Sequence, residues 1–158
     1  IEGYITEAEK GGAKILVDGR GAVVEGKENG TYVGPTVIDG VTPDMSVATE
    51  EIFGPVISIM HTDTLDEAIK IENANPYGNA AAVFTQSGGL ARYVMEHANA
   101  GMIGVNIGVA APMAYFPFSG WKDSFLGVMH GQGRDGVEFY TDKKVVVERW
   151  PKEWSRKF

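Results

Sequence analysis

The sequence predicts an α/β fold in which a parallel sheet carries helices on both faces. Three short runs rich in aliphatic residues, 55–61, 80–85 and 101–107, have the length and composition of buried strands. Two amphipathic segments of helical period alternate with these runs, and the connections are short. A strand–helix–strand–helix–strand order is typical of parallel strands joined by helical crossovers.

The two central helices have recognisable boundaries. The first is predicted to begin at Thr64, because Thr64 and Glu67 form a capping box in which each side chain can bond a backbone amide of the first turn. It is predicted to stop at Asn75, since the following proline disfavours helical backbone in the residue before it. The second helix follows Gly88-Gly89 and repeats apolar residues at helical spacing over 90–98.

The flanking segments are predicted to be less regular. Residues 1–8 have the pattern of a helix already under way, so the chain is expected to begin inside a longer protein, and 13–17 form a strand candidate. Asn29-Gly30 is the signal of a tight hairpin turn. The glycine-rich stretch 108–136 is a long loop of the kind that usually has a function, and 143–149 is a strand candidate at the chain end.

Composition narrows the class of protein. The chain has 158 residues, 44% of them hydrophobic, which is enough for one domain with a core. Its net charge of −7 repels phosphate backbones, so nucleic acid is not an expected partner. No apolar run could span a bilayer and no secretory leader pattern is present, so we expect no membrane association and a cytoplasmic location, or the mitochondrial matrix in a eukaryote.

The reactive side chains are few. The chain has no cysteine, which excludes disulfides, thiolate metal sites and a cysteine nucleophile within these residues. Its histidines, His61, His97 and His130, share no ligand spacing, so no metal site is predicted. No serine or lysine lies in a recognisable nucleophile motif. We therefore assign no catalytic residue in this sequence.

Two motifs could contact a ligand. Gly131–Gly136 matches the G-x-G-x-x-G dinucleotide fingerprint, but that fingerprint needs a strand before it and a long helix after it, and neither is predicted here. We interpret it as a glycine-rich connection. Residues 49–56, Thr-Glu-Glu-Ile-Phe-Gly-Pro-Val, place two carboxylates and an aromatic ring directly before a buried strand. Carboxylates there could bond ribose hydroxyls, although a capped turn entering a strand explains the same composition.

The EEIFGPV segment also resembles the signature of the aldehyde dehydrogenase superfamily. Further segments resemble that family in the same order: GPTVIDGVTPDM, NANPYGNAAAVFT, GVNIG and PFSGWKDS. The resemblance extends from Ile1 to about Trp150, and NANPYGN, PMAYFPFSGWKDSF and GVEFYTDKKVVVERW are most similar to the methylmalonate-semialdehyde dehydrogenase branch. It implies that 1–136 form the C-terminal portion of the family's catalytic domain and that 137–158 form an oligomerisation segment and tail.

The resemblance implies roles for four residues. Glu51 matches a glutamate that bonds the nicotinamide ribose, and Phe53 matches an aromatic that packs beside the nicotinamide. Phe118 matches a position that lines the aldehyde pocket. Asn106 matches an asparagine near the catalytic centre, for which we favour a structural, hydrogen-bonding role. The strand around 145–147 matches the segment that pairs across subunits, and unpaired backbone at a chain end independently favours a homo-oligomer.

The implied function is that of the C-terminal part of an NAD-dependent, CoA-acylating (methyl)malonate-semialdehyde dehydrogenase, with the aldehyde and CoA as small-molecule partners. In this family the cysteine nucleophile and the NAD-binding domain lie upstream of EEIFGPV. The chain is therefore expected to be inactive alone and to bind NAD weakly. Two alternatives stay open: a non-catalytic assembly or binding module of the same fold, and part of an aldehyde dehydrogenase that hydrolyses its thioester.

Overall fold

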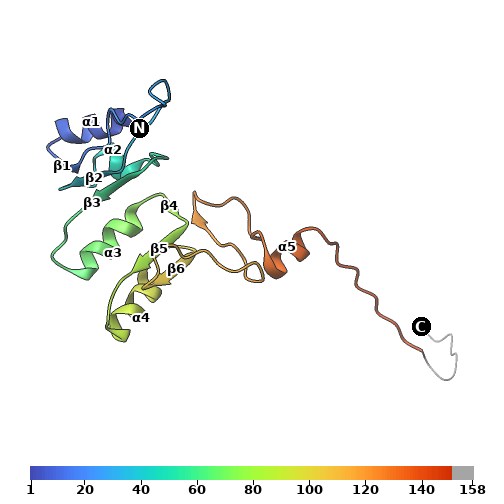
Figure 1. Ribbon diagram of the computed structural model, residues 1–158. Coiled ribbons are helices and arrows are strands. Elements are labelled where there is room, and N and C mark those ends of the chain that lie inside the picture. The colour runs from blue at the N-terminus through green and yellow to red at the C-terminus, as the bar shows by residue number, and fades with distance from the viewer. Residues whose placement is uncertain (151–158) are drawn as a thin grey trace. The chain divides into compact units, whose positions relative to one another are not determined.

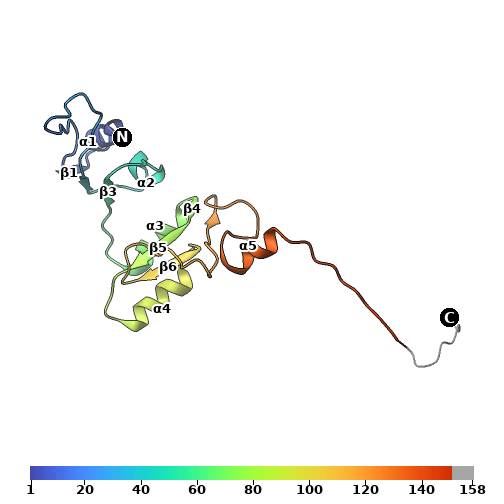
Figure 2. The ribbon, with the colours of Figure 1, turned by 45° about the vertical axis from the view of Figure 1, so that its right-hand side comes forward.

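The computed structural model describes residues 1–150, and Figures 1 and 2 show their helices and strands. Contacts within the chain divide it into two compact units. Unit 1 comprises Ile1–Pro76 and Arg92–Asn99, and unit 2 comprises Tyr77–Ala91 and the chain from Ala100 onward. The α/β class predicted from the sequence is confirmed, because helices and short strands alternate along the chain.

Unit 1 is built on a three-stranded sheet in the order β1-β2-β3. β1 (Lys14–Val17) runs antiparallel to β2 (Thr36–Asp39), and β2 runs parallel to β3 (Val56–Ile59). The helices of this unit are α1 (Glu2–Lys10), the single-turn α2 (Ser46–Thr49) and α3 (Leu65–Ala74).

The core of unit 1 joins α1 to the middle strand. Ile5 of α1 and Ile38 of β2 are fully buried. The same cluster contains four smaller buried side chains, Ala8, Ala13, Val41 and Val47. Burying an isoleucine side chain contributes about 1.5–3 kcal/mol, so these two residues are the main apolar anchors of the unit.

The predicted boundaries of α3 are confirmed. The Thr64 hydroxyl accepts a hydrogen bond of 3.2 Å from the Glu67 amide, as a capping box requires. The Glu67 carboxylate reaches one residue further back than the ideal box and accepts from the Asp63 amide at 3.1 Å. The helix stops at Ala74 because Asn75, before proline, is extended.

Unit 2 contains two small sheets. β5 (Ala80–Val83) and β6 (Met102–Val105) are parallel, and the helix α4 (Gly88–His97) lies between them in sequence, as predicted. β4 (Tyr77–Gly78) pairs antiparallel with β7 (Trp121–Lys122). The last helix is α5 (Gly133–Phe139).

The prediction of one parallel sheet through all three apolar runs is wrong. The run at 55–61 supplies β3, which belongs to the sheet of unit 1, whereas β5 and β6 form a separate sheet. The neighbour of β3 is β2, and β2 was not identified as a strand from the sequence. The prediction therefore joined β3 to the wrong strands. Strand pairing depends on contacts distant in sequence, which the order of elements alone does not determine.

The hairpin predicted at Asn29-Gly30 is also wrong. A turn does form there, with the Gly30 amide donating to the Lys27 carbonyl at 3.0 Å, but no strands flank it. β1 and β2 are instead joined by a long connection, residues 18–35. Its base is closed by a 2.8 Å bond from the Gly34 amide to the Gly19 carbonyl, and a side chain at Gly19 would collide with that glycine.

The strand predicted at 143–149 is not formed in the single chain. Residues 141–150 carry no helix or strand, and Val145 and Val147 are exposed. A strand is stabilised by a neighbour, and the described part of the chain provides none for this segment. The remaining tail, 151–158, lies outside the described residues. Within 1–150 no helix has the length and apolarity needed to cross a membrane.

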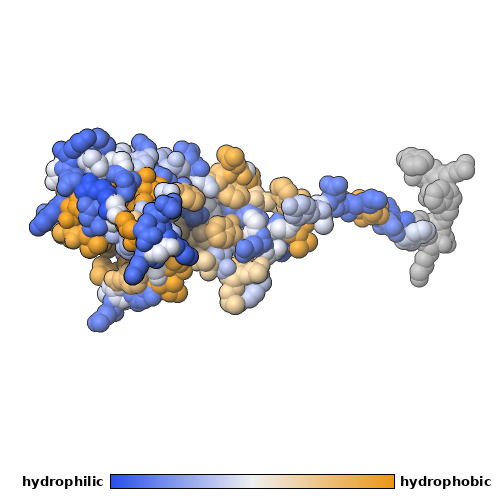
Figure 3. Space-filling model, turned by 45° about the horizontal axis from the view of Figure 1, so that its top comes forward, coloured by the Kyte–Doolittle hydropathy of each residue, from blue (hydrophilic) through white to orange (hydrophobic). Residues whose placement is uncertain are grey.

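Many large apolar side chains lie at the surface, and Figure 3 shows them as orange areas among hydrophilic residues. Those of unit 2 that are at least half exposed include Phe84, Ile107, Val109, Met113, Tyr115, Phe116, Leu126 and Val128. Exposed apolar surface on this scale is typical of surfaces that are covered by another part of a protein or by a partner.

Candidate functional site

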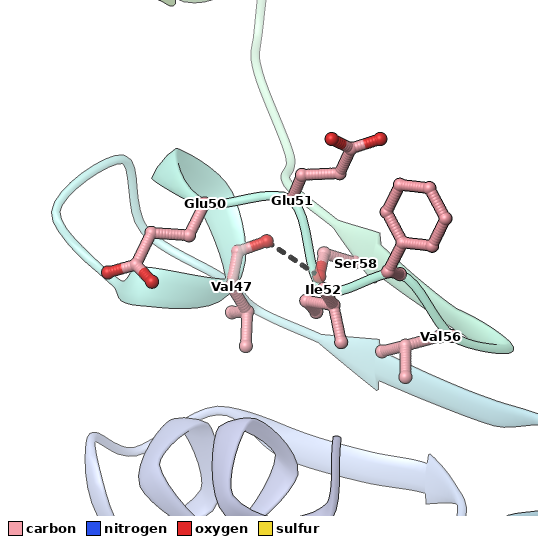
Figure 4. A pocket seen from close by; sticks show the side chains of 8 residues that line it. Val47, Glu50, Glu51, Ile52, Val56 and Ser58 are labelled. Atoms are coloured by element: carbon pink, nitrogen blue, oxygen red, sulfur yellow. Dashed lines mark hydrogen bonds between the residues drawn. The ribbon is translucent and has the colours of Figure 1, made fainter.

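The segment between α2 and β3 forms the candidate site. It is an open pocket of about 500 Å³ in unit 1 (Figure 4). Its wall is made by Val47, Glu50, Glu51, Ile52, Phe53, Gly54, Val56 and Ser58. The pocket is held together where the Ser58 hydroxyl of β3 donates to the Val47 carbonyl of α2 at 3.2 Å. This bond joins β3 to α2, and Glu50 and Glu51 lie on the segment of chain between these two elements.

The two neighbouring glutamates have different environments. Glu50 accepts a hydrogen bond of 2.6 Å from the Tyr4 hydroxyl of α1, and that carboxylate raises the pKa of Tyr4. Glu51 is exposed, and its side chain leaves the backbone in another direction (Figure 4). Within residues 1–150 the Glu51 carboxylate has no hydrogen-bonding or ionic partner. Of the two carboxylates, Glu51 is therefore the one available to a ligand.

Phe53 has an unusual backbone conformation. Its φ is 56°, in the left-handed region, and its side chain is 86% exposed. This region is unfavourable for a bulky residue that is not glycine, and such conformations cost on the order of 1–3 kcal/mol. Because the ring is exposed, burial of apolar surface does not offset the cost of this backbone conformation. Strain of this kind is concentrated at binding and catalytic sites.

The chemistry of this pocket fits part of a dinucleotide. A free carboxylate is a good acceptor for the two hydroxyls of a ribose, and an exposed ring can cover a planar heterocycle. None of the residues that line the pocket is basic, so the pocket offers no cation to the phosphates. The Gly131–Gly136 motif does not supply a phosphate site either, since α5 has only seven residues and no strand directly precedes it.

Asn106 follows β6 and bonds the end of β5. Its side-chain oxygen accepts from the Thr85 amide at 2.9 Å and its amide donates to the Thr85 carbonyl at 3.1 Å. Its backbone amide donates to the Val83 carbonyl at 2.8 Å. Asn106 has a φ of 57°, a conformation that asparagine tolerates well. The side chain thus continues the β5–β6 ladder by one more pair of hydrogen bonds.

Phe118 lies in the loop before β7. Its backbone amide donates to the Gly131 carbonyl at 2.7 Å, which makes an isolated antiparallel bridge, and its side chain is 40% exposed. Glu51 and Phe53 therefore share one pocket in unit 1. Asn106 and Phe118 belong to unit 2, where each has its own partners. In the described part of the chain, no three or more potential ligand side chains gather as a metal site would require.

Tyr4 is a hydrogen-bonding partner of the pocket that the sequence did not reveal. It lies 46 residues before Glu50, and no local pattern connects the two. Ser58 and Val47 were also not identified as parts of the pocket, because the strand and the short helix that carry them meet only in the folded unit. The positive φ of Phe53 likewise has no signature in a sequence that places phenylalanine there.

Comparison with known proteins identifies the family. The model of the aldehyde dehydrogenase family matches residues 1–146. A malonate-semialdehyde dehydrogenase 2 of Geobacillus kaustophilus is 53% identical over 148 residues, which are 93% of this chain and 30% of the relative. The chain thus spans about 30% of the length of the curated relatives that it matches.

Solved structures agree with this assignment. The methylmalonate-semialdehyde dehydrogenase of Oceanimonas doudoroffii matches with a TM-score of 0.92 and 46% identity, over 96% of this chain and 31% of that one. A protein of Sinorhizobium meliloti 1021 assigned to the same type and solved with NAD matches with a TM-score of 0.92 and 39% identity, over the same shares. The resemblance inferred from the sequence is confirmed: the chain belongs to the aldehyde dehydrogenase family, whose members are oxidoreductases.

Proposed function

We propose that this chain supplies one wall of the cofactor and aldehyde site of an NAD-dependent, CoA-acylating (methyl)malonate-semialdehyde dehydrogenase. The observation that carries the proposal is the pairing of Glu51 and Phe53 in one pocket. The carboxylate has no partner in the described residues, and the ring is exposed on strained backbone. Neither feature stabilises unit 1, and both suit a ligand that has a diol and a planar ring.

Each residue has a distinct part in this proposal. Glu51 accepts hydrogen bonds from the nicotinamide ribose, and Phe53 covers one side of the nicotinamide and excludes water there. Phe118 lines the aldehyde pocket, and Asn106 holds the ends of β5 and β6 together. NAD, when bound, supplies the electron acceptor for oxidation of the aldehyde.

The chain is proposed to be inactive without the rest of such an enzyme. It has no cysteine to attack the aldehyde carbon, and the match to the relatives covers about 30% of their length. Residues 1–136 would be the C-terminal portion of the catalytic domain. Residues 137–158 would contain the segment that pairs between subunits of a cytoplasmic homo-oligomer. Support for that pairing comes from the exposed valines at 145 and 147, whose backbone lacks a partner in the described chain.

A chimera tests the role of Glu51. The matching segment of the Geobacillus kaustophilus enzyme is replaced by this chain, and NADH formation is followed with malonate semialdehyde and CoA. Loss of a hydrogen bond to a charged group costs about 1.5–3 kcal/mol, so Glu51→Gln is expected to raise the KM for NAD about tenfold or more. Glu50→Gln is the matched control, because that side chain is bonded to Tyr4. Equal effects of the two variants would contradict the proposal.

The unassisted chain provides a second test. The purified 158 residues are given NAD, CoA and methylmalonate semialdehyde, and NADH is measured. We expect no signal above background from a folded sample. Turnover would show that a nucleophile other than cysteine acts in this chain, and the proposal of a site wall without its own catalytic residue would fail.

A further inference from the structure

The segment that carries Glu51 and Phe53 is attached to the rest of unit 1 at every second position. The attached residues are Glu50, Ile52 and Gly54. Ile52 packs against the core of unit 1, and the residues on either side of it are exposed. Glu51 and Phe53 each lie between two attached residues, and this restricts the directions in which their side chains leave the backbone.

Helix α1 provides two of the three attachments. At one end of the segment the Tyr4 hydroxyl donates to the Glu50 carboxylate at 2.6 Å. At the other end the side chain of Ile1, the N-cap residue of α1, covers Gly54, where a Cβ would lie only 2.5 Å from the Ile1 Cδ1. The Tyr4 amide donates to the Ile1 carbonyl at 3.0 Å, so the first turn of the helix holds the two contacts together.

The donor in this arrangement is itself well fixed. The next residue of α1, Ile5, is fully buried, and the Tyr4 ring packs against the same core. A hydrogen bond between two freely moving surface side chains contributes little, because both must be ordered to form it. A ring that already packs on a core has lost most of that freedom. The neighbouring carboxylate also raises the pKa of Tyr4, so the phenol keeps its proton and stays a donor at neutral pH.

We propose that Tyr4 is a positioning residue for the nicotinamide ribose: by holding Glu50 it fixes the backbone from which the Glu51 carboxylate meets the ribose hydroxyls. The inference rests on the proposed function, since it requires Glu51 to bind that ribose. When Glu50 is released from α1, Glu51 is in reach of the ribose for a smaller fraction of the time. The apparent affinity for NAD then falls with that fraction.

Hydrogen exchange of the whole chain tests the positioning without any ligand. The Glu50 amide donates to the Ser46 carbonyl at 2.9 Å and reports on the start of the segment, and the Val41 amide donates to the Ile59 carbonyl at 3.0 Å and reports on the sheet. Tyr4→Phe removes only the hydroxyl and is expected to lower the protection of the Glu50 amide about threefold relative to Val41. An unchanged ratio would overturn the proposal, and so would an equal fall at both amides, which would mean that Tyr4 only supports the fold.

Three further variants assign the effect to one hydrogen bond. Tyr93→Phe is the matched control and should leave the ratio unchanged, since the Tyr93 hydroxyl also donates to a carboxylate of unit 1, that of Asp66, at 2.8 Å, and neither residue lines the pocket. Glu50→Leu should reproduce the effect of Tyr4→Phe, whereas Glu50→Gln keeps an oxygen that accepts the bond and should retain most of the protection. The double variant Tyr4→Phe with Glu50→Leu should lose no more than either alone. Additive losses would show that the two side chains act independently and would overturn the proposal.

The chimera with the Geobacillus kaustophilus enzyme separates this proposal from the proposed function. There Tyr4→Phe is expected to raise the KM for NAD about threefold and to leave kcat and the KM for CoA unchanged, as loss of uniform binding to one substrate would do. If Glu51→Gln raises the KM for NAD and Tyr4→Phe does not, the positioning role fails and the proposed function stands. If neither variant raises it, the proposed function fails and with it the contact with the ribose, whereas the exchange experiment decides separately whether Tyr4 fixes the segment.

Discussion

Unit 1 encloses large aliphatic side chains, whereas unit 2 encloses small ones. Ile5 and Ile38 are fully buried in unit 1. In the described residues of unit 2 the buried apolar side chains are alanines, Ala91 and Ala100, while Leu126 is 94% exposed. Alanine contributes little to a core, so unit 2 depends more on its hydrogen bonds. The comparison shows that one chain can contain a unit with a core of large aliphatic side chains and a unit whose described buried side chains are small.

The largest expected effect comes from the core of unit 1. Ile38→Ala is expected to lower the free energy of unfolding of unit 1 by about 2–5 kcal/mol, because it leaves a cavity at a fully buried position. Ile57→Ala, on the neighbouring strand but 63% exposed, is expected to cost less than about 1 kcal/mol. Amide exchange in β2 measures unit 1, and exchange of the Asn106 amide, which donates to the Val83 carbonyl, measures unit 2. If both variants lowered the free energy of unfolding by similar amounts, Ile38 and Ile57 would not differ as core and surface residues of the sheet.

A buried hydroxyl gives the next effect. Thr36 is 1% exposed, and its hydroxyl accepts from the Gly19 amide at 3.0 Å. Thr36→Val keeps the shape but leaves that amide without its partner, so a loss of about 1–3 kcal/mol is expected, measured by denaturant unfolding. Thr49→Val is the control, because Thr49 is exposed and its hydroxyl makes, among the described residues, a single long hydrogen bond of 3.4 Å to the Met45 carbonyl. A neutral Thr36→Val would show that the 18–35 connection contributes nothing to unit 1.

In unit 2 the variant Asn106→Ala removes hydrogen bonds rather than buried apolar side chains. Asn106→Ala deletes both side-chain bonds to Thr85 and places alanine in the left-handed region, so about 1–2 kcal/mol is expected. Asn106→Gly separates the two causes, since glycine keeps the conformation without strain. Exchange of the Thr85 amide measures the loss. If neither variant changes it, the stability of unit 2 has another source.

The smallest effect is a dependence on pH in unit 1. The hydrogen bond from His61 holds the pKa of Asp39 below its ordinary value. A carboxyl with a lowered folded-state pKa stabilises the fold above about pH 4, and this contribution disappears as the pH falls through the folded value. Asp39→Asn is therefore expected to match the unaltered chain at low pH and to be less stable near neutrality. Unfolding curves at several pH values check this, and a gap that widens in acid would contradict it.

Local signals in the sequence predicted individual elements well. Thr64, Glu67 and the proline after Asn75 were enough to define α3, because capping and termination involve neighbours within four residues. The pairing of β3 with β2 was missed, since pairing is determined by packing around Ile38 rather than by the order of elements. The parallel pair β5–β6 was predicted because its connection is a single helix.

The candidate site shows the same difference between local signals, which the sequence reveals, and contacts distant in sequence, which it does not. The EEIFGPV segment predicted ligand contacts, which stay a prediction, and all of its residues except Pro55 line one pocket. What the sequence could not show is that Tyr4 holds Glu50 and leaves Glu51 free, because that contact joins α1 to the end of α2.

The left-handed backbone at Phe53 has a consequence for the engineering of this protein. Glycine or asparagine adopts that conformation at lower cost, and either would also remove an exposed ring from water. Phe53→Gly should therefore raise the melting temperature of unit 1. A laboratory selection for heat resistance alone would replace Phe53 early and would remove part of the wall of the pocket. Stability and the proposed ligand contact are opposed at this position, and a screen that measures both is needed to retain Phe53.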